Sequence, residues 1–242
     1  MENITSRKNP YIRHLRQLAS DADYRRQKRE YICDGEKTLR EALRFGDVAS
    51  ILWRDTPGTA DCCLQYTAPA ELFDYASPLK NSAGPVFTVA MPQRDRAEVK
   101  RAIVLEGVQD PGNVGTVIRT ANAFGIDAVV LTGGCADLYN PKTVRATMGA
   151  VFRQLVLETD DLPAFLNETG LPLYGAALAD NALDVRRVDL KNAAVAIGSE
   201  GRGLSEELLD ICREKIIIPM DPDSESLNAA VAAAVCMWEM AR

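Results

Sequence analysis

The chain has 242 residues, 47% apolar and 26% charged, which is enough apolar sequence for one large domain or two modest ones. It has no run of about 18 apolar residues and no apolar stretch at its N-terminus, so neither a membrane span nor a signal peptide is expected. The net charge of −6 excludes a uniformly basic protein, and six scattered cysteines with one histidine argue against a metal site and for a cytoplasmic protein with reduced thiols.

The N-terminal part of the chain alternates short helices and strands. Residues 4–19 are predicted to form an amphipathic helix, because Ile12, Leu15 and Leu18 recur at helical spacing. The elements expected next are strand 30–34, helix 36–45, strands 48–53 and 63–67, helix 69–76 and strand 85–90. This alternation predicts a small α/β domain over residues 1–92, followed by a polar linker at 93–100.

The first 45 residues are basic although the whole chain is acidic. They hold 11 Lys or Arg against 7 Asp or Glu, whereas the rest of the chain holds 17 against 27. A protein that binds a polyanion needs a local positive surface rather than a positive total. The candidate contacts are Arg7, Lys8, Arg13, Arg16, Arg25 and Arg26. From charge alone, a solvated helical face is an equally good interpretation.

Beyond the linker, residues 101–242 carry strands that are apolar throughout. These strands are expected within 102–108, 127–134, 153–159, 171–179, 193–199 and 215–220. Continuous apolar strands separated by helix-length segments predict a parallel sheet covered on both faces. In such sheets, ligands bind outside the carboxyl ends of the strands. Glycines and polar residues that directly follow the strands are therefore expected at one edge.

Three segments of this half are interpreted as one site. They are residues 112–125, 196–208 and 216–235. Their polar residues among apolar neighbours are Arg119, Glu200, Ser226 and Asn228, which are candidates for one convergent pocket. Simpler interpretations exist: a surface arginine, a plain glycine-rich loop, and helix caps at Asn113 and at Ser224 or Ser226.

Common nucleotide-binding motifs are absent from the sequence. No G-x-G-x-x-G follows a strand, and no G-x-x-x-x-G-K-[ST] is present. The single histidine, His14, lies in the basic N-terminal segment, far in sequence from the expected pocket. The place of His14 argues against catalysis by imidazole. The missing glycine motif disfavours a nucleotide-dependent oxidoreductase, which stays as an alternative.

The polar motifs, in their order along the chain, resemble those of the SpoU/TrmH family of RNA ribose 2′-O-methyltransferases in the SPOUT superfamily. Asn113-x5-Arg119 resembles the first motif of the family, and Gly198-Ser199-Glu200-Gly201 resembles its second motif. Pro219 followed by Ser226-Leu227-Asn228 resembles the third motif of the family, with Ala229 where the family often has valine. The stretch 139–150 and the N-terminal segments are also similar, so the resemblance covers nearly the whole chain.

The resemblance implies a C-terminal SPOUT domain with a deep trefoil knot and a smaller N-terminal domain that binds the RNA substrate. It also implies S-adenosylmethionine as cofactor and a homodimer whose active sites draw on both subunits. The implied catalytic residues are Asn113, Arg119, Glu200, Ser226 and Asn228. The implied cofactor contacts are Ala177, Leu178, Gly198, Ile218 and Leu227. Ribosomal RNA is the preferred substrate, with transfer RNA and a catalytically silent RNA-binding protein as alternatives.

Overall fold

The computed structural model describes residues 1–60, 63–80, 82–92, 98–179, 181–221, 223 and 225–242. The chain divides into two compact units. Unit 1 contains residues 1–93 and 137–153, and unit 2 contains residues 94–136 and 154–242. Residues 93–97 of the expected linker lie outside the described residues. In the described part of the chain, no helix is both long and apolar enough to cross a lipid bilayer.

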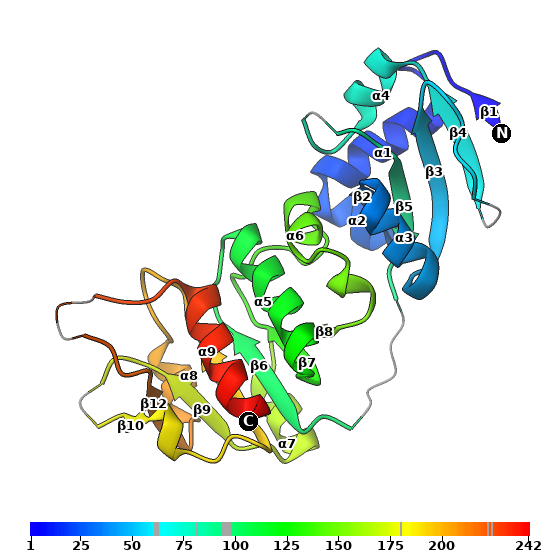
Figure 1. Ribbon diagram of the computed structural model, residues 1–242. Coiled ribbons are helices and arrows are strands. Elements are labelled where there is room, and N and C mark those ends of the chain that lie inside the picture. Colours follow the sequence, from blue (N-terminus) through cyan, green and yellow to red (C-terminus); the bar gives the residue numbers. More distant parts are fainter. Residues whose placement is uncertain (61–62, 81, 93–97, 180, 222, 224) are drawn as a thin grey trace. The chain divides into compact units, whose positions relative to one another are not determined.

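Unit 1 is built on a mixed five-stranded sheet (Figure 1). The strands, in sheet order, are β1 (Glu2–Asn3), β4 (Leu64–Ala68), β3 (Val48–Arg54), β5 (Val86–Ala90) and β2 (Glu30–Asp34). β4 runs parallel to β1 and β3, whereas β5 is antiparallel to β3 and β2. Its helices are α1 (Pro10–Ser20), α2 (Ala22–Lys28), α3 (Glu36–Phe45) and α4 (Ala70–Ala76).

The helix expected from residue 4 begins later, at Pro10. The Asn9 side chain accepts a hydrogen bond from the Tyr11 N–H and caps α1, with Pro10 in the first turn. Ile4 instead extends the sheet, since its N–H donates to the Thr67 carbonyl at 2.8 Å. The expected apolar stripe of α1 is confirmed: Ile12, Leu15 and Leu18 are fully buried.

Residues 137–153 group with unit 1 although they lie between two strands of unit 2. They form helix α6 (Pro141–Ala146) and a 3₁₀ turn, η1 (Ala150–Phe152). Buried Arg25 of α2 forms an ion pair with Asp137, and Arg153 pairs with Glu41 at 2.9 Å. The Tyr31 and Tyr139 rings lie 4.6 Å apart, centroid to centroid. Charged and aromatic contacts therefore fix this segment to unit 1.

Unit 2 is a seven-stranded sheet in which every neighbouring pair is parallel, as the sequence predicts. In sheet order the strands are β10 (Leu183–Asp184), β12 (Glu214–Ile217), β9 (Leu173–Ala176), β11 (Ala193–Ile197), β6 (Arg101–Leu105), β7 (Ala128–Leu131) and β8 (Leu155–Glu158). Its helices are α5 (Pro111–Phe124), α7 (Leu162–Thr169), α8 (Glu206–Asp210) and α9 (Ala229–Ala241), with the 3₁₀ turn η2 (Val185–Arg187).

Helices cover both faces of this sheet, which explains why its central strands are apolar throughout. α5 and α9 pack side by side against β6, β7 and β11 (Figure 1). On the other face, Phe165 of α7 and Leu208 of α8 cluster with Val104 of β6. Because β6, β11, β9 and β12 are aligned and parallel, the residues that follow them meet at one edge.

Candidate active site

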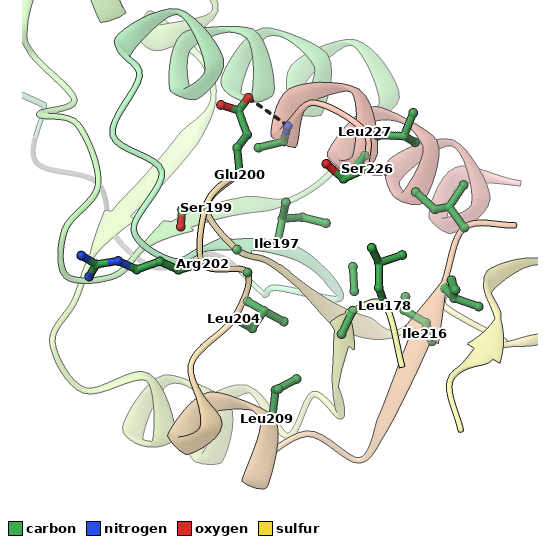
Figure 2. A pocket seen from close by; sticks show the side chains of 18 of the residues that line it. Leu178, Ile197, Ser199, Glu200, Arg202, Leu204, Leu209, Ile216, Ser226 and Leu227 are labelled. Atoms are coloured by element: carbon green, nitrogen blue, oxygen red, sulfur yellow. Dashed lines mark hydrogen bonds between the residues drawn. The ribbon is translucent and has the colours of Figure 1, made fainter. Parts of the chain in front are cut away.

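A cavity of about 390 Å³ opens at the carboxyl ends of β9, β11 and β12 (Figure 2). Most of its lining side chains are apolar, which is typical of sites for small organic ligands. The residues expected to contact a cofactor all line it: Ala177, Leu178, Gly198, Ile218 and Leu227. Ser226, expected in the catalytic set, lines it as well. Residues that follow the strand ends therefore line one cavity, at the edge of the sheet where the sequence predicts a ligand site.

The loop after β11 folds tightly over its own beginning. The Gly203 N–H donates to the Ser199 carbonyl at 2.9 Å. A Cβ placed on Gly198 would lie 2.1 Å from the Gly203 carbonyl carbon and 2.4 Å from the Leu204 nitrogen. Only glycine fits at position 198, because those neighbours are backbone atoms that cannot rotate away. The glycine-rich sequence is therefore required by a backbone crossing beside the cavity.

Three side chains from distant parts of the chain meet at the rim of the cavity. Asn113 Nδ2 donates to Glu200 Oε1 at 2.9 Å, and Asn228 Nδ2 donates to Asn113 Oδ1 at 3.1 Å. Asn228 also donates to the same Glu200 oxygen. Glu200 accepts a further, longer hydrogen bond of 3.5 Å from the Ala229 N–H at the start of α9 (Figure 2). We call Asn113, Glu200 and Asn228 the rim triad.

The helix caps differ from the expected ones, and this difference frees two side chains. Asp110, rather than Asn113, caps α5 by accepting from the Asn113 N–H at 2.8 Å. Asn228, rather than Ser226, caps α9 through its Oδ1, which accepts from the N–H groups of Ala230 and Val231. The other expected cap, Ser224, lies outside the described residues. The Asn113 side chain is thus available for Glu200, and Ser226 faces the cavity.

Arg119 is not brought to the rim triad within one chain. It is an exposed residue of α5, does not line the cavity, and has no hydrogen bond or ion pair among the described residues. A helix turns by about 100° per residue, so Arg119 lies about 9 Å along the axis from Asn113 and about 120° around it. The structure therefore separates the expected arginine from the other polar residues of the expected site.

Five of the six basic candidates of unit 1 lie on its surface, and one does not. Arg7, Lys8, Arg13, Arg16 and Arg26 are exposed. Arg7 and Arg16 both lie over the Tyr75 ring, at 4.7 and 5.2 Å from its centroid. Arg25 corrects the expectation: it is 3% exposed, forms the Asp137 ion pair and donates to the Leu18 carbonyl at 2.6 Å. A side chain so enclosed cannot reach a phosphate in solution.

Sequence reasoning missed two residues at this edge of the sheet. Arg202 lines the cavity, and its side chain points away from it in Figure 2. Glu106, the residue after β6, accepts two hydrogen bonds from Ser205 at the end of the glycine-rich loop. The place of Glu106 in the sequence could have indicated it, because Glu106 follows an apolar strand just as Ser199 and Glu200 follow β11.

Known proteins resemble this chain in sequence and in structure. Residues 100–238 match the model of the SpoU rRNA Methylase family. The chain is 32% identical, over 99% of both sequences, to the 23S rRNA (guanosine(2553)-2'-O)-methyltransferase RlmP of Bacillus subtilis. The solved structure of an AdoMet-bound rRNA methyltransferase from Sinorhizobium meliloti is 26% identical, with a TM-score of 0.86 over 98% of this chain and 96% of that one.

A second solved structure, described as an RNA 2'-O ribose methyltransferase, is 27% identical, with a TM-score of 0.81 over 98% of this chain and 97% of that one. The likeness thus extends over both units, and the matched family model contains the cavity and the rim triad. This chain belongs to the SpoU rRNA methylase family.

Proposed function

We propose that this protein transfers a methyl group from S-adenosylmethionine to the 2′-hydroxyl of a ribose in ribosomal RNA. Membership of the SpoU rRNA methylase family and the likeness to RlmP over nearly the whole chain support this function. The observation that carries the proposal is the rim triad beside an apolar cavity at the carboxyl edge of a parallel sheet. The free thiols of Cys33, Cys135, Cys212 and Cys236 suit a cytoplasmic enzyme.

The cavity suits S-adenosylmethionine in size and in chemistry. Its volume of about 390 Å³ lies within the usual range for small-molecule sites. Leu178, Ile218 and Leu227 provide an apolar surface for an adenine ring, and the Gly198 backbone, without a side chain, lines the same cavity. When bound there, the cofactor supplies a methyl group already activated by its sulfonium charge. Ala177 completes the proposed set of cofactor contacts.

The chain's own residues orient the ribose and stabilise charge. Holding the reacting groups in line can supply roughly 7–11 kcal/mol of the barrier. Asn113 and Asn228 are proposed to hold the ribose or Arg119, while Glu200 and Ser226 support the loops. Arg119 is proposed to stabilise the negative charge that develops on the 2′-oxygen. A guanidinium group is already fully protonated and does not accept a proton, so the hydroxyl proton passes to an RNA phosphate or to water.

A homodimer would bring Arg119 to a cavity. An apolar groove between α5 and α9 contains Phe124, Val231 and Trp238, and the last two are 48% and 57% exposed. Thr116 of α5 lines the groove, and Arg119 lies one turn further, about 60° around the helix. Packing this groove against its copy would cover the apolar surface. We propose that each Arg119 then serves the partner's cavity, and that the chain carries the trefoil knot implied by its resemblance to the SpoU/TrmH family.

Unit 1 is proposed to hold the RNA. Its exposed Arg7, Lys8, Arg13, Arg16 and Arg26 are suited to phosphate contacts, which position RNA without reading its sequence. The log of the RNA affinity should then fall linearly with the log of salt concentration, with a slope of about −0.7 to −0.9 per neutralised phosphate. An affinity that does not depend on salt would contradict this role.

Mapping ribose methylation in cellular RNA, with and without the protein, tests the function directly. We expect one methylated ribose in ribosomal RNA to disappear with the protein. A lost site in transfer RNA would contradict the substrate assignment but not the chemistry. A thermal shift with S-adenosylmethionine and not with NAD would support the cofactor. No shift with the methyl donor and no lost methylation would overturn the proposed enzyme.

A further inference from the structure

Glu106 fixes both ends of the glycine-rich loop that follows β11. At the start of the loop, the Glu106 N–H donates to the Ile197 carbonyl at 3.0 Å. At its end, the Ser205 N–H donates to Glu106 Oε2 and the Ser205 hydroxyl donates to Oε1, both at 2.7 Å. One residue of the neighbouring strand end is thus bound to the two ends of a loop almost a hundred positions further along the chain.

The loop held by Glu106 carries residues of the proposed site. Gly198 lines the cavity at the start of the loop, and Glu200 belongs to the rim triad. The Gly203 N–H bond to the Ser199 carbonyl closes the middle of the loop. Beyond it, the Ser205 hydroxyl accepts from the Leu208 N–H at 3.1 Å and begins α8. A shift at Ser205 would therefore be transmitted to Gly198 and Glu200.

The Glu106 carboxylate is well suited to such a fixed position. It is partly buried, and hydrogen bonds to a charged acceptor are stronger than those between neutral groups. The two donors approach different oxygens, so they define the orientation of the carboxylate as well as its place. Removing it would leave the Ser205 N–H and hydroxyl without these partners.

We propose that Glu106 is a positioning residue for methyl transfer. It binds both ends of the loop 198–205 and so holds Gly198 against the cofactor and Glu200 within the rim triad. This inference rests on the proposed function. Glu106 does not line the cavity, so it acts through the loop rather than on the reacting atoms. A loosened loop should weaken cofactor binding and slow turnover, whereas RNA affinity, which depends on unit 1, should change little.

The test compares Glu106→Ala with Glu106→Gln in the full-length protein. Glu106→Ala should weaken S-adenosylmethionine binding and lower kcat about tenfold or more each, with an RNA KM close to wild type. Glu106→Gln should restore most of both losses, because its carbonyl still accepts from the Ser205 N–H and its amide can donate to the Ser205 hydroxyl. Ser205→Ala removes the hydroxyl bond to Glu106 and the hydroxyl cap on the Leu208 N–H, but it keeps the bond from the Ser205 N–H. It should therefore give an intermediate loss of cofactor binding and turnover, and it is the substitute variant if Glu106→Ala does not fold.

Asp161→Ala is the matched control. Asp161 is also a carboxylate of unit 2 that accepts from a backbone N–H, that of Ala164 at 2.9 Å, but it caps α7 and does not line the cavity. This variant should lose stability while cofactor affinity and kcat stay at wild-type values. If Asp161→Ala and Glu106→Ala reduced activity alike, Glu106 would have only a general structural role.

Hydrogen exchange in the free protein separates this inference from the proposed function. The amides of residues 198–205 should exchange faster in Glu106→Ala than in the wild type and in Asp161→Ala. Unchanged exchange of these amides in Glu106→Ala, or unchanged cofactor affinity, would overturn the proposed role of Glu106. If the wild type bound no S-adenosylmethionine, the proposed function would fail, and exchange of the loop amides would still decide whether Glu106 holds the loop.

Discussion

Asn228 donates to Asn113 across 115 positions of the chain and thereby joins the start of α9 to the first turn of α5. The two ends of the Asn228 amide have different roles. Its Oδ1 caps α9, whereas its Nδ2 binds Asn113 and Glu200. A single side chain thus contributes to helix stability through one atom and to the rim triad through another, and substitutions can separate the two.

Asn228→Ser should separate capping from catalysis. Serine caps helices about as well as asparagine but has no amide group to donate to Glu200. We expect stability close to wild type and a substantially lower kcat. Asn228→Ala should lose the cap as well, which costs typically about 1 kcal/mol and lowers Tm by about 2–4 °C. Calorimetry and single-turnover methylation measure both effects, and a fully active Asn228→Ser would exclude a role for the amide.

Arg119→Ala should abolish most turnover without weakening cofactor binding. Removing a donor that stabilises a developing oxyanion typically costs a factor of about 10²–10³ in kcat. Arg119→Lys should recover little, because the ammonium lacks the planar fork of guanidinium. The control is Arg213→Ala, an exposed arginine of unit 2 that does not line the cavity. Near-normal turnover of Arg119→Ala with bound cofactor would show that the arginine has another role.

Two glycines of one loop should respond oppositely to alanine. A Cβ on Gly198 would lie 2.1 Å from the carbonyl carbon of Gly203, whereas a Cβ on Gly201 would meet nothing within 4 Å. Gly198→Ala should therefore disrupt the loop and eliminate cofactor binding, and Gly201→Ala should preserve it. The thermal shift produced by S-adenosylmethionine measures both. Equal binding by the two variants would show that the loop opens easily at Gly198.

The sequence predicted the sheet better than it predicted the partners of its side chains. Uninterrupted apolar strands indicate a parallel sheet, and strand ends indicate a ligand site, because both depend on local pattern. Arg25 pairs with Asp137, 112 positions away, and no local pattern distinguishes such a buried arginine from its exposed neighbours. Glu106 was missed for the same reason, since its partner Ser205 is 99 positions distant.

Acid should destabilise unit 1 through Glu30. Burial raises the pKa of this carboxyl, but hydrogen bonds from His14 and Thr88 outweigh burial and lower the pKa below its usual value of 4.5. A lowered folded-state pKa stabilises the protein above the unfolded-state pKa, and this contribution is lost as pH falls through the folded-state value. The free energy of unfolding of the wild type, measured with urea, should therefore decrease below about pH 4.5. Glu30→Gln should reduce this dependence on pH. An identical pH profile in the variant would contradict this account.

Trp238 provides a test of the proposed dimer. This residue of the α5/α9 groove is 57% exposed, and its ring lies 5.7 Å from the Phe124 ring between centroids. Trp238→Glu would place a charge in a buried interface and should yield monomers in analytical ultracentrifugation. Leu183→Glu, at an apolar residue of unit 2 that is 45% exposed and lies outside the groove, is the control and should keep the wild-type assembly. Dimeric Trp238→Glu would place any interface elsewhere.

Mixing two inactive variants should reveal whether Arg119 serves the partner's cavity. Arg119→Ala keeps an intact cavity, whereas Ala177→Trp fills the cavity and keeps Arg119. In a mixed dimer, the intact cavity of the first subunit would face the intact arginine of the second, so one complete site would form. Unfolding and refolding the variants together should restore methylation above the level of either alone. If Arg119 served its own subunit's cavity, every site in the mixture would lack one component, and activity would stay at the level of the parents.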